Sequence, residues 1–426
     1  MNCISGSILL TCLFGCSACG APTSETRSGS TGKTYAIHYT VTPDASTGSV
    51  AIVMDVQQSR GHLRELSFAR SATAASDIEG DGELEVTADH VRWRPPRDGG
   101  QLRWRVTVPT RRTGGGYDAW LDDSWGIFRA EDIIPRAKSR TLKGATSNTT
   151  LTFDLPPGWS AVTEYFSRNN KFLVKIPDRR LDLPQGWIVI GNLGVRRETI
   201  AGVRVAIAAP VGQAVRRLDI LALLNWTLPE LMSMLAEPLR RLTIVSAGDP
   251  MWRGGLSAPG SMFIHAERPL ISENATSTVL HEVVHIAFGI RARNGYDWIT
   301  EGLAEYYSLE LLRRGGAITE RRYKAAAAGQ IAWAETAGTL CGSRSSGATT
   351  ALAVTTFAKL DREIRAVSNG ASTLDDFVAA MIAADALLDL DTLAEIAADL
   401  LGQPSEVLRL DTMPGCQTFA NVAIEA

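Results

Sequence analysis

The amino-acid sequence predicts an α+β protein in which a β-rich, sandwich-like domain precedes a mainly helical part with a small sheet. Apolar and polar residues alternate in short segments up to Pro210, which is typical of half-buried antiparallel strands. From Val211 onward the apolar residues recur with a helical period. The length of 426 residues also exceeds that of one small fold and favours two or three packed units.

The β-rich domain is expected over residues 34–210, after a linker at 21–33 that is rich in Ser, Thr and Gly. The histidines of this region show no metal-ligand spacing, so we expect ordinary strand or surface histidines. The expected strands are bounded by Gly, Pro, Asp or Asn and lie at 34–41, 49–56, 84–93, 102–108, 150–155, 171–176, 186–191 and 203–209.

The helical part begins with a helix pattern at 218–239 that Pro229 is expected to break. A strand at 242–247 and a Gly-rich turn follow, and then Ser261–Ala266, which we expect to be an edge strand. Further helical patterns lie at 278–289, 301–314 and 349–367. No period of about 20 to 50 residues repeats, which excludes a solenoid.

Composition excludes several classes of function. The hydrophobic share of 45% with 21% charged residues is that of an ordinary globular protein and excludes global disorder. The net charge of −3 and the pI of about 6.1 provide no basic surface for a nucleic-acid backbone. We therefore expect no nucleic-acid partner.

Residues 1–20 are expected to be an export signal outside the fold. Residues 4–15 are apolar and too short to span a bilayer, but they have the length of a secretory signal core. The sequence Leu-Phe-Gly before Cys16 resembles a bacterial lipoprotein signal in which Cys16 is lipidated; Cys19 is the alternative site. A plain signal peptide with incidental cysteines is the other interpretation. In each case we expect an exported protein of the bacterial cell envelope or periplasm, with membrane contact only through a lipid anchor.

The pentapeptide HEVVH at residues 281–285 is the most informative motif. On a helix, positions i and i+4 share one face, so His281 and His285 can bind one metal ion while Glu282 lies beside them. A preceding Ser-Thr pair can cap this helix and Gly289 can end it. The alternative is a buried helix with two hydrogen-bonded histidines.

A second motif, WITEGLAEYY, occupies residues 298–307. It resembles the second half of the zinc site of gluzincin metallopeptidases, where the Glu of an E-G-x-x tract is the last protein ligand. The resemblance implies that Glu301 joins His281 and His285 in holding one Zn²⁺, and three protein ligands leave a fourth position for water, as in catalytic zinc sites. Thr300 is expected to cap this helix, so that Glu301 lies in its first turn, where the helix dipole favours the carboxylate.

Glu305 follows Glu301 by four residues and shares its helix face. In gluzincins a carboxylate at this offset bonds the free ring nitrogen of a ligating histidine, so the resemblance implies that Glu305 orients His281. A solvated surface glutamate is the alternative. Tyr306 and Tyr307 point away from this face and are expected to pack.

The order of the segments is similar to that of the glycyl aminopeptidase family of gluzincins: a β-rich domain, the edge strand Gly254-Gly255-Leu256, the two zinc motifs and a helical end. This resemblance covers residues from about 35 to 400. It implies a thermolysin-like catalytic domain at 211–315 and a helical domain at 316–426, without the PDZ domain frequent in the family. Weaker matches are Leu360–Arg365 with Ser372–Asp376, and Gly116–Ala119 with Trp125.

Two positions depart from that family. Its members carry an acidic residue after Gly-Gly-Leu that holds the substrate's free amine, but Ser257 stands here, so aminopeptidase specificity is not implied. Glu267 or Glu273 could supply a carboxylate from a loop. The family's tyrosine that donates to the oxyanion falls near Thr350; Tyr323 is a candidate substitute, and an exposed helix tyrosine is the alternative.

These observations favour a zinc metallopeptidase that hydrolyses peptide bonds of a peptide or protein substrate. Zinc would activate water and polarise the scissile carbonyl, and Glu282 would act as general base and then acid. The edge strand near Gly254 would align an extended substrate by strand addition. Two hypotheses compete: a weakly active or non-catalytic lipoprotein that binds a peptide or protein partner, and a zinc hydrolase of non-peptide esters or amides.

Cys341 and Cys416 are the only cysteines beyond the expected signal. An exported protein meets an oxidising compartment, so we predict that the two form a disulfide bond. Two free thiols are the alternative.

Overall fold

The computed structural model describes residues 33–70, 75–176, 179–342 and 344–417, and the predicted signal with Cys16 and Cys19 lies outside them. The α+β class is confirmed. The helices are α1 (Ala130–Ile133), α2 (Arg217–Ser233), α3 (Thr278–Phe288), α4 (Trp298–Arg314), α5 (Glu320–Ala334), α6 (Ala348–Val367), α7 (Leu374–Ala384) and α8 (Leu390–Leu401), with a 3-10 turn η2 at Leu410–Thr412. The strands are β1 (Lys33–Asp44), β2 (Ser49–Gln57), β3 (Leu63–Ala69), β4 (Ser76–Gly80), β5 (Glu83–Val86), β6 (His90–Arg94), β7 (Gly99–Thr107), β8 (Thr110–Arg111), β9 (Tyr117–Leu121), β10 (Trp125–Arg129), β11 (Lys138–Thr141), β12 (Ala145–Phe153), β13 (Ser160–Val162), β14 (Phe166–Arg168), β15 (Lys171–Val174), β16 (Trp187–Gly191), β17 (Leu193–Ile200), β18 (Val203–Pro210), β19 (Arg241–Ala247), β20 (Gly255–Ala258), β21 (Ser261–His265), β22 (Arg291–Ala292) and β23 (Leu387–Leu388).

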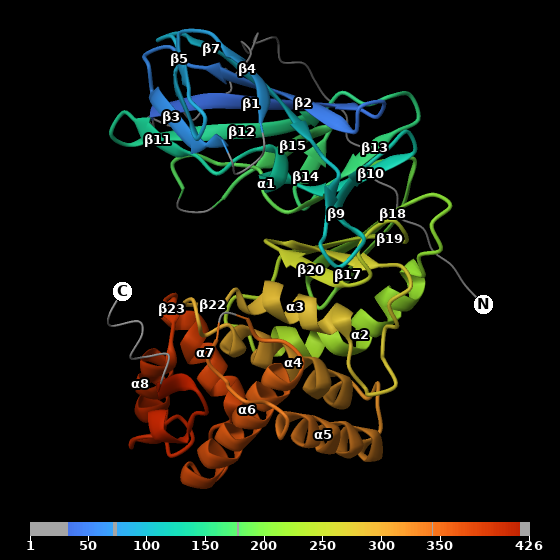
Figure 1. The fold of residues 1–426 in the computed structure, drawn as a ribbon, viewed down its shortest axis with the longest axis vertical. Coiled ribbons are helices and arrows are strands. Elements are labelled where there is room, and N and C mark those ends of the chain that lie inside the picture. The colour runs from blue at the N-terminus through green and yellow to red at the C-terminus, as the bar shows by residue number, and fades with distance from the viewer. Residues whose placement is uncertain (1–32, 71–74, 177–178, 343, 418–426) are drawn as a thin grey trace, which may run out of the picture. The chain divides into compact units, whose positions relative to one another are not determined.

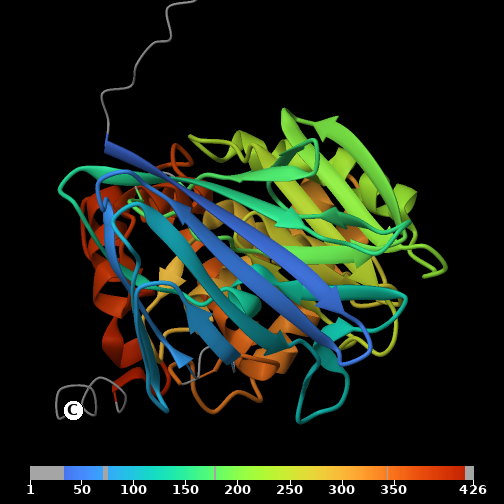
Figure 2. The same cartoon turned by 90° about the horizontal axis from the view of Figure 1, so that it is seen from above.

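Three sheets make up the β-rich part. The largest has the strand order β14-β15-β12-β1-β2-β7-β4, and its long strands lie side by side in Figure 2. A four-stranded sheet, β11-β3-β6-β5, and a five-stranded sheet, β13-β16-β10-β9-β8, complete this part. The alternating burial along β1 and β2 places one row of side chains in a shared core, as the sequence pattern predicts.

Two details of strand pairing differ from the expectation. The first strand, β1, pairs in parallel with β12, although all strands of this part were expected to be antiparallel. The single strand expected at 84–93 is a hairpin of β5 and β6, because Thr87 to Asp89 make a turn with Thr87 N donating to His90 O at 2.9 Å. Neither feature is visible in the alternation of apolar residues, which does not reveal which strand a segment pairs with.

A second five-stranded sheet, β17-β18-β19-β21-β20, underlies the helical part. It includes β17 and β18, so the domain boundary expected after residue 210 cuts through this sheet. Strands β18, β19 and β21 are parallel and β20 is the edge. Ser261–Ala266, expected at the edge, is therefore mostly interior, since β21 lies between β19 and β20. All five residues of β21 are buried, as in a strand covered on both faces.

This sheet is a layer between two different partners. Helices α2 and α3 cover one face, where Ile207 and Ile244 join the core formed with the helices (Figure 1). On the other face, Val245 and Phe263 pack against Trp187 of β16 in a smaller cluster. The sheet thereby connects the β-rich part to the helices that carry the sequence motifs.

Pro229 does not break the first helix. It lies inside α2, which runs without interruption from Arg217 to Ser233. The proline removes one backbone donor, but Leu228 and Leu231 on either side of it are buried in the helical core. Packing of the last turns therefore keeps the helix continuous.

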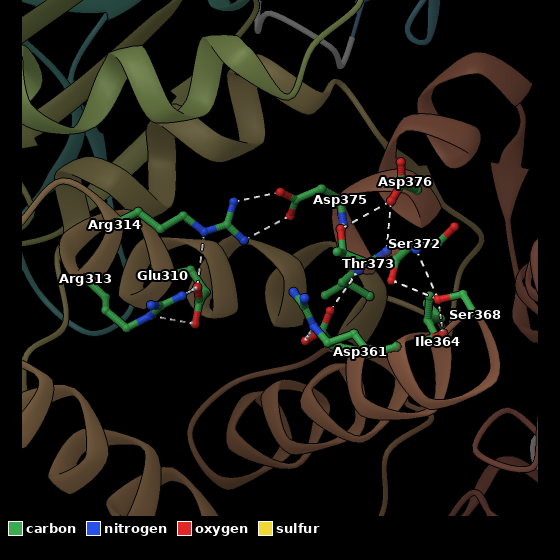
Figure 3. A network of polar contacts seen from close by, with 12 residues as sticks. Glu310, Arg313, Arg314, Asp361, Ile364, Ser368, Ser372, Thr373, Asp375 and Asp376 are labelled. Atoms are coloured by element: carbon green, nitrogen blue, oxygen red, sulfur yellow. Dashed lines mark hydrogen bonds and ion pairs between the residues drawn. The ribbon is translucent and has the colours of Figure 1, made fainter. Parts of the chain in front are cut away.

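The tract that weakly matched the glycyl aminopeptidases forms a polar network between α4, α6 and α7 (Figure 3). Arg314 donates to both oxygens of Asp375 at 2.7 and 3.0 Å and also bonds Glu310, which accepts from Arg313. Asp361 accepts from the first N–H of α7 at 2.8 Å. Asp361 and Asp375 of this tract thus accept hydrogen bonds that connect the ends of α4, α6 and α7.

Cys341 and Cys416 form a disulfide bond that closes 75 residues of chain. It attaches the α5–α6 loop to the segment after α8, and both cysteines are buried in the helical core. Among the described residues, no helix combines the length and the apolar character needed to cross a bilayer.

Candidate metal centre

Helix α3 presents its two histidines on the face opposite the core. Ser277 caps the helix by accepting a hydrogen bond from Leu280 N at 3.3 Å, and Gly289 ends it with φ of 60°. Val283 and Val284 between the histidines and Leu280 before them are buried, which fixes the rotation of the helix about its axis. His281 and His285 are therefore held toward a cavity by the packing of the opposite face.

Three side chains converge at this face. The Nε2 atoms of His281 and His285 lie 3.1 Å apart. The two carboxylate oxygens of Glu301 lie 3.3 Å from the Nε2 of His281 and 3.5 Å from the Nε2 of His285. The three ligand atoms all lie within 4.8 Å of one another. Among the described residues, this is the group of His, Cys, Asp and Glu side chains that could hold a metal ion.

The charges of this cluster fit a divalent cation. Burial opposes a proton on His281, but the hydrogen bonds to Glu301 and Glu305 outweigh burial and raise the pKa to about 10. Burial and the neighbouring His281 lower the pKa of His285 to about 4. The carboxylates of Glu301 and Glu305 therefore favour positive charge at this position. Two imidazole nitrogens and one carboxylate are a donor set that zinc favours.

Glu301 and Glu305 project from the beginning of α4. Glu301 lies in the first turn, and the hydrogen bond from His281 overcomes the effect of burial and lowers its pKa. Glu305 Oε2 lies 3.2 Å from Nδ1 of His281, the geometry expected for a carboxylate that orients this ring. Thr300 is not the cap: α4 begins at Trp298 after Asp297, and Thr300 Oγ1 donates to Asp297 O at 3.0 Å inside the first turn.

Glu282 lies between the histidines and the edge strand β20. Its side chain is 8% exposed, and burial raises its pKa while His281 and hydrogen bonds from Ser257 oppose the rise. A Cβ atom on Gly255 would come within 3.0 Å of Glu282 Cγ and within 2.6 Å of the Thr278 methyl group. Gly255 is therefore the residue that lets β20 approach α3 closely enough to contact Glu282.

Two cavities meet at the cluster. One has a volume of about 1050 Å³ and runs along β20 and α3, with Glu282 and His285 in its wall. The other, of about 800 Å³, lies toward α5 and the start of α6. His281, Glu301 and Glu305 line both cavities, so an extended molecule lying across these residues would have one part in each.

No protein-family model matches the sequence, and no curated protein matches it. Solved structures do resemble the fold. An aminopeptidase N family protein from Idiomarina loihiensis aligns over 91% of this chain and 75% of its own at TM-score 0.60 and 17% identity. An M1 zinc metallopeptidase from Deinococcus radiodurans aligns over 89% and 93% at TM-score 0.54 and 18% identity. Yeast LTA4 hydrolase, in complex with bestatin, aligns over 90% and 68% at TM-score 0.54 and 13% identity.

This chain has a gluzincin fold. The predicted resemblance to gluzincins is thereby confirmed at the level of the fold. The three structures are an aminopeptidase N family protein, an M1 zinc metallopeptidase and an LTA4 hydrolase, so the narrower resemblance to the glycyl aminopeptidases stays a prediction. The roles of individual site residues also stay predictions, which the geometry above makes specific.

Several residues considered for the site have other partners in this gluzincin fold. The hydroxyl of Tyr323 donates to Glu310 in the helical core, and Thr350 shares a hydrogen bond of 3.1 Å with Ser345. Glu267 lies in an ion pair with Arg253 at 2.9 Å, outside both cavities. Glu273 lines the cavity near α5.

The sequence analysis did not identify Trp252, which lines the cavity along β20. The guanidinium carbon of Arg112 lies 3.9 Å from the centre of the Trp252 ring, and Trp252 N donates to Tyr117 O at 2.9 Å. A Cβ on Gly116 would approach the Trp252 backbone to 2.8 Å. The tract Gly116–Ala119, noted only as a family match, thus attaches the β-rich part to the wall of the cavity. An aromatic residue just before the Gly-Gly pair was the available signal.

Proposed function

We propose that this protein is a zinc-dependent metallopeptidase. The observation that carries the proposal is the convergence of His281, His285 and Glu301 in one cavity with the carboxyl group of Glu282 and the edge strand β20. The fold supports peptidase chemistry because its structural relatives include zinc metallopeptidases, as their names state. Export to the bacterial cell envelope is part of the proposal and rests on the pattern of residues 1–20 alone.

His281, His285 and Glu301 would hold the zinc ion, which when bound supplies Lewis-acid polarisation of the scissile carbonyl and activation of water. Glu305 keeps the Nδ1 proton of His281 in place, so that Nε2 is free to bind the metal. Glu282 accepts a proton from the attacking water on its carboxylate and donates it to the amine nitrogen that leaves. Its buried position raises its affinity for that proton between the two transfers.

The strand β20 is suited to hold the substrate backbone. It pairs with β21 on one side only, so no strand covers its other edge, where the Ser257 N–H bonds Glu282 and an extended peptide could be added. Gly255 lets this strand lie against Glu282. A peptide added to β20 would pass next to the general base.

Glu282→Gln tests the proposal, because the amide cannot accept the proton. Purified protein, its zinc content measured by elemental analysis, is incubated with a diverse peptide library, and products are identified by mass spectrometry. We expect the wild type to hold about one zinc and cleave peptides, and the variant to keep zinc but lose cleavage by at least about a hundredfold. Glu267→Gln, outside both cavities, is the matched control and should cleave like the wild type. A wild type without zinc, or a fully active Glu282→Gln, would refute the proposal.

A second candidate is a weakly active or non-catalytic protein of the same fold that binds a peptide. It is favoured by one observation: among the described residues, no tyrosine lines either cavity, and Tyr323 is bonded to Glu310. Loss of one oxyanion donor typically costs about 10² to 10³ in rate, which weakens an enzyme without abolishing its activity. Peptide binding by zinc-loaded wild type without cleavage would favour this candidate, and cleavage of esters alone would favour a non-peptide hydrolase.

A further inference from the structure

Helix α5 reaches the metal centre through one side chain. Gln330 Nε2 donates to Glu305 Oε1 at 3.3 Å, while the other carboxylate oxygen of Glu305 lies 3.2 Å from Nδ1 of His281. The two contacts form a continuous line from α5 through α4 to α3. Since Glu305 accepts at both oxygens, the rotation of its carboxylate is fixed from two sides.

The position of Gln330 is not explained by packing. Its carbonyl oxygen Oε1 is buried and has no hydrogen-bond partner among the described residues. A buried acceptor without a partner destabilises the folded state, and an apolar side chain of the same length would avoid that cost. A glutamine at this position supplies an N–H donor to Glu305, which an apolar side chain could not do.

Helix α5 lies against α6, and polar contacts attach it to α4 and to the loop before α3. Ala334 is its only buried residue, and Tyr323, seven positions before Gln330 and so on the same face, donates to Glu310 of α4. Arg322 donates to the carbonyl of Ser272 at 2.6 Å. Tyr323 and Arg322 therefore anchor the helix, and Gln330 contacts the metal centre from the wall of the cavity near α5.

We infer that Gln330 is a positioning residue for the metal centre: by fixing the carboxylate of Glu305, it holds the His281 ring in its ligating orientation and slows the release of the metal. This inference rests on the proposed zinc site. It assigns to α5, which supplies no ligand, control over how long the metal stays bound. Removal of a direct carboxylate partner of a ligating histidine costs about 10- to 100-fold in metal affinity, and one contact further out we expect an effect near the lower limit.

The test measures zinc transfer from the full-length protein to a chromogenic chelator. Gln330→Met keeps the length of the side chain and removes the donor, so zinc release should accelerate about tenfold with little change in the melting temperature. Gln330→His, which retains an N–H donor, should restore most of the slow release. In the cobalt-substituted protein, the visible absorption bands should shift in Gln330→Met and return toward the wild type in Gln330→His.

Two further variants separate this role from anchoring of α5. Tyr323→Phe removes the anchor to Glu310 and should lower the melting temperature while zinc release stays slow. Lys324→Met, exposed on the same helix, should change neither quantity. Release at the wild-type rate from Gln330→Met would overturn the inference, as would equal acceleration in Tyr323→Phe. If the wild type holds no zinc, the proposed function itself fails; if zinc is bound but no peptide is cleaved, the inference about Gln330 is still decided by the release rates.

Discussion

Helices α4 and α5 both contact the metal centre, but different forces hold them. Helix α4 has twelve buried residues, and its apolar side chains belong to the main helical core. Helix α5 has one buried residue; it lies against α6, and Tyr323, Arg322 and Gln330 supply its polar contacts. Burial of several apolar side chains contributes far more free energy than a few hydrogen bonds partly exposed to water. The ligand Glu301 therefore lies on the firmly packed helix α4. The hydrogen bond that orients Glu305 comes from Gln330 on α5, which is more easily displaced.

The largest expected effect is the loss of zinc when a metal ligand on α3 or α4, the helices packed in the core, is removed. His285→Ala should lose the zinc completely, because only one histidine and Glu301 would remain. Elemental analysis of the purified variant measures this. His90→Ala, in strand β6 of the β-rich part, is the control and should keep about one zinc. Full zinc occupancy in His285→Ala would contradict the assignment of the site.

Loss of the disulfide bond should destabilise α5, the less buried of the two helices, more than α4. It closes 75 residues and tethers the loop that follows α5, so replacing both Cys341 and Cys416 by Ala should cost about 4 kcal/mol of unfolding free energy in the chain-entropy model. Denaturant unfolding measures the loss, and hydrogen exchange should show α5 opening before α4. Two titratable thiols at these positions in the denatured, unreduced protein would exclude the bond.

A pair of glycines compares the two helices directly. A Cβ on Gly302 of α4 would lie 2.5 Å from the Cβ of Ala353 in α6, whereas a Cβ on Gly329 of α5 would meet nothing within 4 Å. Gly302→Ala should therefore destabilise the protein by about 1 to 3 kcal/mol. Gly329→Ala should stabilise it by about 0.5 to 1 kcal/mol through helix propensity. Thermal unfolding of both variants checks this; equal effects would mean that α4 and α5 are packed alike.

The smallest expected effect concerns the substrate's amino group. Among the described residues, Glu273 is the only acidic residue that lines either cavity apart from Glu282, Glu301 and Glu305. It is exposed, in the loop whose Ser272 carbonyl accepts from Arg322 of α5, so it is poorly placed to bury an ammonium group. Peptides with free and acetylated N-termini should be cleaved at comparable rates. A loss of about a hundredfold on acetylation, about 3 kcal/mol, would show an acidic anchor, and Glu273→Gln would then identify it.

Local signals in the sequence predicted much of the site. The spacing of HEVVH, the serine cap and Gly289 describe a helix because these contacts are made within about one turn. Glu301 was assigned from the resemblance to gluzincins, and Glu305 follows it by about one helix turn on the same face. The pairing of Cys341 with Cys416 was the single combination left once the leader was set aside, and the structure joins them.

Features that depend on distant segments could not be predicted in the same way. Whether β21 is an edge or an interior strand depends on β20 and β19, and the membership of β17 and β18 depends on β19. Tyr323 was considered as a substitute for the oxyanion donor missing near Thr350; its bond to Glu310 on another helix is not visible in sequence spacing. Gln330 was missed for the same reason: a glutamine on a polar helix carries no local signal of function.

The five-stranded sheet that begins with β17 and β18 constrains the order in which the chain can fold during its synthesis. During synthesis the β-rich sheets can pair as soon as β16 has emerged, and β18 can pair with β17. The sheet can grow further only when β19 has been made, and β20 can join only after β21. A fragment that starts at residue 211 would lack two strands and expose the open side of β19 to other chains. A fragment that starts near Leu193 would keep the whole sheet, yet it would uncover Val245 and Phe263, which Trp187 covers in the complete protein. The helical part therefore shares its sheet with strands β17 and β18, which are made before the two zinc-site motifs.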